Sequence, residues 1–286
     1  MKIRKAIIPC GGRGTRFLPV TKSVAKEILP VIDTPVLAYI VGEMVDSGID
    51  QIMIVTSPAK EASIRSYFTR DAELEAALED KPELLEIVRN INTRAEIRYA
   101  VQKKPRGSGD AVMLTRKFTA GEPFCMANGD DLMVSDIPVA KQLAAAYEQN
   151  AGVIMGVQQV EASEAHKYGI IKPKEIIGRR VLCDGIVEKP KSNPPSRYAA
   201  LGRYVFTPEI YEYIERDKRD GELNVTNAIA DMMKDGKVYA YEFEGRRYDM
   251  GDKFGALTAT VDFALKNAEL KDKFVAYLKD VLGNEG

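Results

Sequence analysis

Short apolar segments alternate with amphipathic helical segments in the first half of the chain, and this alternation limits the fold more than any other feature. Strand-like segments lie at Lys5–Pro9, Gln51–Val55, Glu96–Val101, Pro123–Ala127 and Gly152–Val157, and helical patterns cover 35–48, 108–117 and 138–150. Strands that are separated by helices usually belong to βαβ units, in which neighbouring strands run parallel. The pattern therefore predicts an α/β protein with a mostly parallel sheet.

The second half of the chain is richer in strand patterns. Strands and turns are indicated at Lys167–Pro173, Arg179–Pro190 and Arg197–Phe206, and helices at 208–215 and 224–234. Residues 58–94 carry charged helical patterns, which predict a solvated helical insertion. No Ser/Gly-rich linker divides the chain. We therefore expect one domain over residues 1–286, with lobes at about 1–150 and 151–252 and a helical C-terminal segment at about 253–286.

The composition disfavours several classes of function. Charged residues make up 29% of the chain, but the net charge is only −1, which gives no electrostatic sign of a nucleic-acid or membrane partner. Cys10, Cys125 and Cys183 have no CxxC spacing, so they fit a reducing compartment. The apolar run Ala6–Pro9 is too short for a signal peptide. We expect a cytoplasmic protein, and the single histidine, His166, disfavours a Ser-His-Asp triad.

A glycine-rich turn, Cys10–Arg16, follows the first strand. Glycines at positions 11, 12 and 14 allow a tight turn and let backbone N–H groups approach a phosphate without Cβ clashes. The spacing is not G-x-G-x-x-G, because the third site is Phe17, and no Walker A lysine follows. Taken alone, the turn is weak evidence, and a purely structural role is the alternative.

Charged side chains of both signs stand near this turn or after a later strand. Arg16, Lys22 and Lys26 follow the glycines, and such cations can hold phosphate oxygens, although each alone could be surface charge. Asp130 and Asp131 follow the strand Pro123–Ala127. Carboxylates just beyond the carboxyl end of a strand lie where α/β sheets bind ligands. The alternative is that Asp130 and Asp131 are ordinary polar residues of a surface loop.

The string from Gly11 to Val31, GGRGTRFLPVTKSVAKEILPV, resembles the opening of the sugar-1-phosphate nucleotidylyltransferases and is most similar to their uridylyltransferase branch. The similarity continues in order through segments that begin at Gln102, Asn128, Lys167, Val187, Gly202 and Tyr248, so it covers nearly the whole chain. The resemblance implies a Rossmann-like mixed sheet flanked by helices, an integrated sugar-binding lobe and C-terminal helices.

The resemblance also assigns the nucleotide site. The residues implied to embrace the triphosphate are Gly11, Gly12, Gly14, Thr15 and Arg16. Lys26 would neutralise the reacting phosphates, and Glu27 would lie near the nucleoside. Gln102 and Gly107 would read the uracil edge, since a side-chain amide offers both a donor and an acceptor. The alternative for Gln102 is an ordinary polar residue at a strand end.

For the metal, the resemblance implies Asp130 and Asp249 as ligands, with Asp131 behind them. Oxygen ligands and a phosphate substrate favour Mg²⁺. The alternative for Asp249 is that it caps a helix beginning near Lys253, because aspartate is a good N-cap.

For the sugar 1-phosphate, the resemblance implies Gly169, Glu188 and Lys189, with Lys189 meeting the phosphate; the alternative is a charge pair on an edge strand. Six positions differ from the family's usual residues: Cys10 and Gly11 stand for alanines, Arg13 for leucine, Asp110 for histidine, Asn227 for aspartate and Asp252 for serine.

The implied reaction transfers a uridylyl group from UTP to glucose 1-phosphate and gives UDP-glucose and pyrophosphate. Its catalytic residues would be Arg16, Lys26, Asp130, Lys189 and Asp249. The attacking phosphate is already an anion, so alignment and charge stabilisation suffice without a general base. The alternatives are a thymidylyltransferase or another base or sugar, a metal-dependent glycosyltransferase, a NAD-dependent dehydrogenase and a non-catalytic paralogue.

Apolar residues also recur at near-helical spacing at the end of the chain: Phe263, Leu270, Phe274, Leu278 and Leu282. Together with the resemblance, this pattern predicts a homo-oligomer, a dimer or tetramer. The alternative is that these residues pack against the chain's own core.

Overall fold

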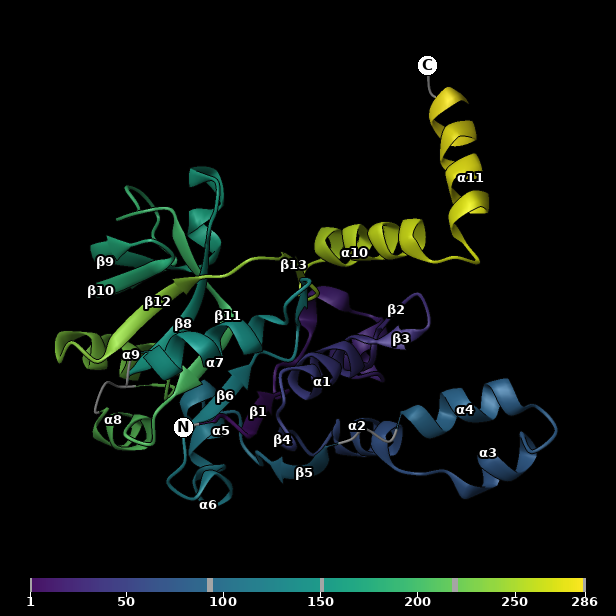
Figure 1. The fold of residues 1–286 in the computed structure, drawn as a ribbon, viewed down its shortest axis with the longest axis horizontal. Coiled ribbons are helices and arrows are strands. Elements are labelled where there is room, and N and C mark those ends of the chain that lie inside the picture. The colour runs from purple at the N-terminus through teal and green to yellow at the C-terminus, as the bar shows by residue number, and fades with distance from the viewer. Residues whose placement is uncertain (1, 92–94, 150–151, 218–220, 285–286) are drawn as a thin grey trace.

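The computed structural model describes residues 2–91, 95–149, 152–217 and 221–284, and its centre is a nine-stranded mixed sheet (Figure 1). The strands of this sheet are β1 (Lys5–Pro9), β4 (Gln51–Thr56), β5 (Glu96–Val101), β6 (Phe124–Ala127), β8 (Val153–Gln159), β9 (Gly169–Ile177), β10 (Arg180–Glu188), β11 (Tyr198–Phe206) and β12 (Val238–Glu242). Their order is β5-β4-β1-β6-β11-β8-β12-β10-β9. Two small sheets pair β2 (Pro30–Val31) with β3 (Thr34–Pro35), and β7 (Asp131–Val134) with β13 (Arg246–Asp249).

Parallel pairing is concentrated among the N-terminal strands. β5, β4, β1 and β6 are parallel neighbours, as the alternating sequence pattern predicts. β11 runs antiparallel to both β6 and β8, and the β9–β10 hairpin is antiparallel as well, while β12 is parallel to β8. The predicted mixed α/β fold is confirmed, and one sheet contains strands from both predicted lobes. Contrary to the sequence pattern's prediction, the sheet as a whole is not mostly parallel, because β9, β10 and β11 of the second lobe pair antiparallel with their neighbours.

Helices connect and flank these strands. The α-helices are α1 (Val36–Asp46), α2 (Glu61–Phe68), α3 (Ala72–Ala77), α4 (Pro82–Asn90), α5 (Ser108–Met113), α6 (Arg116–Thr119), α7 (Val139–Gln149), α8 (Ile210–Arg216), α9 (Val225–Lys234), α10 (Lys253–Lys266) and α11 (Lys271–Asn284). The 3-10 helices are η1 (Thr15–Phe17), η2 (Val20–Lys22), η3 (Lys26–Ile28) and η4 (Ala162–Lys167). The charged insertion is helical, as predicted, although its residues 92–94, like the predicted helix end at Asn150, lie outside the described residues.

The single helix predicted over residues 108–117 is in fact two helices, α5 and α6. A turn separates them, and the Thr115 hydroxyl donates to the carbonyl of Val112 at 2.7 Å. Threonine hydroxyls compete in this way for backbone acceptors and weaken a continuous helix.

Each face of the sheet has its own apolar core. Along β1, Ala6 and Ile8 belong to the core beneath α1 and α7, whereas Ile7 belongs to the core beneath α5, α8 and α9. This alternation follows from the two-residue period of a strand. Both faces of β1 are therefore covered, which explains why its residues from Ala6 to Pro9 are all apolar.

A buried ion pair fastens α1 to the centre of the sheet. Arg203 of β11 is fully buried, and its Nη2 donates to Glu43 Oε2 of α1 at 2.7 Å and to the carbonyl of Asp131 at 2.7 Å. A buried charge is tolerated only when it is paired and hydrogen-bonded. The contact fixes where β7 begins relative to β11.

The two C-terminal helices extend from the body of the molecule, with α11 standing beyond α10 (Figure 1). Asp252 caps α10, because its Oδ2 accepts hydrogen bonds from the N–H groups of Phe254 and Gly255 at 2.9 and 3.1 Å. The alternative in which Asp249 caps this helix is therefore wrong. Phe263 packs edge-to-face on Tyr39 of α1. No helix in the described part of the chain combines the length and the apolar character needed to cross a bilayer.

Candidate active site

Four parallel strands bring most of the candidate residues to one edge of the sheet. β5, β4, β1 and β6 end there, and the chain beyond them carries Gln102, Lys60, the turn Cys10–Arg16 and Asp130 respectively. The carboxyl edge of parallel strands is where α/β sheets bind ligands.

The glycine-rich turn has a backbone that its sequence makes possible. Gly14 has φ 67°, in the left-handed region that glycine adopts without a Cβ penalty. The Thr21 hydroxyl donates to the Gly14 carbonyl at 2.7 Å, and a Cβ on Gly14 would lie 3.1 Å from Thr21 Cγ2. Thr15 begins η1 directly after this residue, and Arg16 reaches across to donate to the Gly251 carbonyl at 3.1 Å.

The buried Lys60, which the sequence analysis does not name, forms hydrogen bonds to the backbone of this turn. Lys60 Nζ donates to the carbonyls of Cys10, at 3.3 Å, and Gly12. It also donates to both carboxylate oxygens of Glu27, at 2.9 and 3.1 Å. The side chain of Glu27, which the resemblance places near the nucleoside, is 1% exposed and forms an ion pair with Lys60. Burial raises the pKa of Glu27, and the lysine partly opposes this. The sequence signal that could have identified Lys60 as a site residue is its position just beyond the carboxyl end of β4.

The two predicted metal ligands face the same small space. β7 and β13 pair antiparallel, and the N–H of Met250 donates to the Asp130 carbonyl at 2.9 Å. A Cβ built on Gly251 would lie 2.9 Å from Asp130 Oδ2 and 3.1 Å from Asp249 Oδ1. Side chains that are 119 positions apart in sequence are therefore brought together across Gly251.

Each of these carboxylates has a cation beside it. Lys26 Nζ forms an ion pair with Asp130 Oδ2, and Arg247 Nη2 lies 3.4 Å from Asp249 Oδ2. Burial lowers the pKa of Lys26, but Asp130 and Glu27 raise it by more, so the net shift is upward and Lys26 stays a cation.

The donor set fits a small hard cation. Both side chains offer carboxylate oxygens, which Mg²⁺ prefers. Within the described ranges, no group of three or more His, Cys, Asp or Glu side chains could hold a metal ion. A cation bound between Asp130 and Asp249 would therefore need further ligands from substrate or water.

Behind these ligands, Asp131 is buried in a polar network. Its Oδ1 accepts from Arg247 Nε at 2.7 Å, and its Oδ2 accepts from Asn128 Nδ2 at 3.0 Å. Burial raises the pKa of Asp131, and Arg247 acts in the opposite direction. Gly202 makes room for the carboxylate, because a Cβ there would lie 2.1 Å from Asp131 Oδ2. The sequence interpretation named neither Arg247 nor Gly202 as a site residue.

In the predicted sugar site, the pairing of β9 with β10 brings Gly169 close to Glu188 and Lys189. Gly169 of β9 lies opposite Glu188 of β10, and a Cβ on Gly169 would lie 3.1 Å from Glu188 Oε2. The N–H of Lys189 donates to the Tyr168 carbonyl at 3.0 Å. Lys189 Nζ is 3.7 Å from Glu188 Oε1, and both side chains are exposed.

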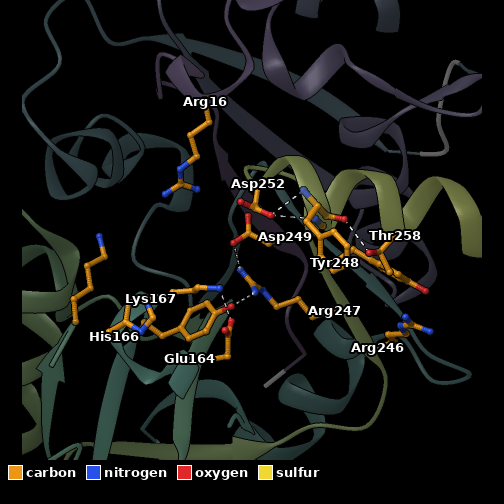
Figure 2. A pocket seen from close by; sticks show the side chains of 14 residues that line it. Arg16, Glu164, His166, Lys167, Arg246, Arg247, Tyr248, Asp249, Asp252 and Thr258 are labelled. Atoms are coloured by element: carbon orange, nitrogen blue, oxygen red, sulfur yellow. Dashed lines mark hydrogen bonds and ion pairs between the residues drawn. The ribbon is translucent and has the colours of Figure 1, made fainter. Parts of the chain in front are cut away.

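The candidate residues are distributed over the walls of three cavities. One of about 300 Å³ is lined by residues that include Arg16, Asp130, Gly169, Glu188, Lys189 and Asp249. A larger cavity of about 630 Å³ shares Arg16, Lys189 and Asp249 with it, and Figure 2 shows Arg247 pointing toward Asp249 there. A third cavity of about 350 Å³ is lined by Gly11 and Gln102 among others.

Gly107 does not line these cavities. A Cβ on it would lie 2.2 Å from the Leu223 carbonyl oxygen, and its φ is 102°. Packing against Leu223 therefore requires glycine at this position.

The chain is similar to a family model and to several known proteins. Residues 5–265 match the family model described as nucleotidyl transferase. The chain is 46% identical to the UTP–glucose-1-phosphate uridylyltransferase of Bacillus subtilis (strain 168), over 99% of each chain. It resembles a UTP-bound UGPase from Acinetobacter baumannii, with TM-score 0.90, 32% identity and coverage of 96% and 98% of the two chains. It also resembles a UDP-glucose pyrophosphorylase complexed with UDP-glucose, with TM-score 0.83, 32% identity and coverage of 93% and 100%.

Gly202→Ala tests the space that Asp131 occupies. We expect a loss of stability well above the roughly 1–2 kcal/mol that a left-handed backbone alone costs a non-glycine residue. Gly178→Ala is the matched control, since φ is 59° there and a Cβ meets nothing within 4 Å. Urea denaturation measures both variants. Equal destabilisation of the two would show that contact with Asp131 contributes nothing.

Proposed function

The chain belongs to the nucleotidyl transferase family, and we propose that it transfers a uridylyl group from UTP to glucose 1-phosphate, giving UDP-glucose and pyrophosphate. The observation that carries this proposal is the 46% identity, over 99% of each chain, to a relative named for that activity. The position of the paired carboxylates supports it. Asp130 and Asp249 line the same cavity as Glu188 and Lys189, at the edge where the glycine-rich turn also lies.

In the proposed reaction, a phosphate oxygen of the sugar phosphate attacks the α-phosphorus in line, and pyrophosphate leaves. Both substrates are anions, so the chain's cations must offset their repulsion. Arg16 and Lys26 lie by the turn, where they would meet the triphosphate, and Lys189 borders the sugar-side cavity. Because close contacts hold Arg16 and Lys26 before substrate binds, their charge stabilisation is preorganised.

Nucleotidyl transferases of this family generally use a divalent metal ion. We propose that it is Mg²⁺ here and that Asp130 and Asp249 hold it. When bound, the ion would neutralise phosphate charge and orient phosphate oxygens. The adjacent Lys26 and Arg247 compensate the two carboxylates and keep them in place.

We further propose that the protein acts in the cytoplasm, without nucleic-acid or membrane partners. Its three cysteines are free and buried, which fits a reducing compartment. We also propose a homo-oligomer that uses α11. Tyr277 and Leu282 on that helix are 61% and 70% exposed, whereas Phe263 of α10 packs on the core.

Pyrophosphate release, measured across a grid of nucleoside triphosphates and sugar 1-phosphates, tests the function. We expect UTP with glucose 1-phosphate to give the highest kcat/KM. A different best pair would assign another base or sugar to the same chemistry. Release of nucleoside diphosphate from a nucleotide sugar, without pyrophosphate, would instead indicate a glycosyltransferase.

Asp249→Asn tests the metal ligand. The substitution keeps an oxygen that can accept from the Gly251 N–H but removes the charge. We expect turnover to fall by roughly 100-fold or more, since preorganised electrostatic stabilisation is lost, and the Mg²⁺ requirement to rise. Asp80→Asn, at an exposed position, is the control. Normal turnover and an unchanged Mg²⁺ dependence in Asp249→Asn would remove Asp249 from the metal site.

Light scattering tests the oligomer. At micromolar concentration we expect a mass that is a multiple of 31.7 kDa. We expect Tyr277→Glu combined with Leu282→Glu to dissociate the assembly, because charges would enter an apolar interface. Lys279→Glu on the same helix is the control. A wild-type monomer would contradict the proposal.

A further inference from the structure

The side-chain amide of Gln102 is held in one orientation by its neighbours. Its Nε2 donates to the Gly107 carbonyl at 3.0 Å and to Asp110 Oδ2 at 2.8 Å. Both partners are acceptors, so the nitrogen must face them. A flipped amide would direct Oε1 at two other oxygens. The two acceptors therefore fix the orientation of the amide, and Asp110 is one of them.

The neighbouring backbone keeps the Gly107 carbonyl in place. The N–H of Leu223 donates to the Arg106 carbonyl at 2.8 Å, and the N–H of Gly109 donates to the Leu223 carbonyl at 2.8 Å. Asp110 lies in the first turn of α5, directly after this crossing. Both acceptors that face Gln102 thus belong to one short, well-connected segment.

The opposite end of the amide is free for a ligand. Gln102 is 8% exposed, and it lines the 350 Å³ cavity together with Gly11. In the described part of the chain, no side-chain or backbone donor is hydrogen-bonded to Oε1. An ideal Cβ on Gly11 would lie 3.0 Å from this oxygen, so glycine leaves the carbonyl uncrowded.

We propose that Asp110 is a specificity-determining residue, which acts by fixing Gln102 as a hydrogen-bond acceptor toward the base. With both Nε2 hydrogens engaged, Gln102 offers the base only Oε1. Uracil and thymine carry a ring N3–H that can donate to this oxygen. The N3 of cytosine is itself an acceptor and would be repelled. The inference rests on the proposed use of UTP, and it assigns discrimination against cytosine to Asp110 rather than to Gln102 alone.

Two substitutions at Asp110 separate this role from a general structural one. Asp110→Leu removes one of the two acceptors and leaves only the Gly107 carbonyl, so Gln102 turns its nitrogen to the cavity more readily. We expect the ratio of kcat/KM for UTP to that for CTP to fall by about tenfold, the size of one well-placed hydrogen bond. Asp110→Asn retains an oxygen that can accept from Nε2, and we expect the ratio to stay near that of the wild type.

The matched controls use the same readout. Asp80→Leu makes the same change at an exposed position and should leave the ratio unaltered. In a Gln102→Ala background, Asp110→Leu should have no further effect on the ratio, because the residue acts through Gln102. Thermal unfolding confirms that each variant is folded.

The outcomes distinguish this inference from the proposed function. If the wild type uses UTP but Asp110→Leu keeps the full preference over CTP, the role of Asp110 is overturned while the function stands. An equal loss of preference in the Gln102→Ala background also overturns it. If the wild type releases no pyrophosphate from UTP, the proposed function fails first, and the inference fails with it.

Discussion

The buried carboxylate of Asp131 is the interaction on which the active-site geometry depends. It accepts from Arg247 of β13 and from Asn128 beyond β6, and Gly202 of β11 makes room for it. Leaving such a charge unpaired in the interior would be costly, so these segments must meet around it. Asp130 precedes it in the chain and Asp249 lies opposite it in the β7–β13 register, so the same contact positions both candidate metal ligands.

A second buried ion pair, Lys60 with Glu27, positions the glycine-rich turn on the predicted nucleotide side. Lys60 neutralises Glu27 and donates to two carbonyls of the glycine-rich turn. The turn is therefore fastened from inside, and its outer face stays available to a ligand. In phosphoryl-transfer chemistry the protein mainly aligns substrates and stabilises charge, which favours rigid supports of this kind.

Local patterns predicted those elements whose physical basis is itself local. The strand β1 and helix α1 follow from apolar periodicity, and the candidate carboxylate Asp130 follows from its place after β6. The short strands β7 and β13 were not predicted, because four residues carry too little periodic signal. Nothing in the sequence indicated that Lys60 would pair with Glu27, because the two residues are 33 positions apart.

The sequence by itself determined the alternating α/β order, the glycine-rich turn and the resemblance that identified the catalytic candidates. Each of these depends only on residues that are close together in the chain. Only the tertiary structure decided which side chains support them. The pairing of Asp131 with Arg247 spans 116 positions, and the need for glycine at position 107 comes from the carbonyl of Leu223. Such contacts depend on how separate segments of the chain come together, and burial then makes each unpaired polar group costly enough to fix its partner.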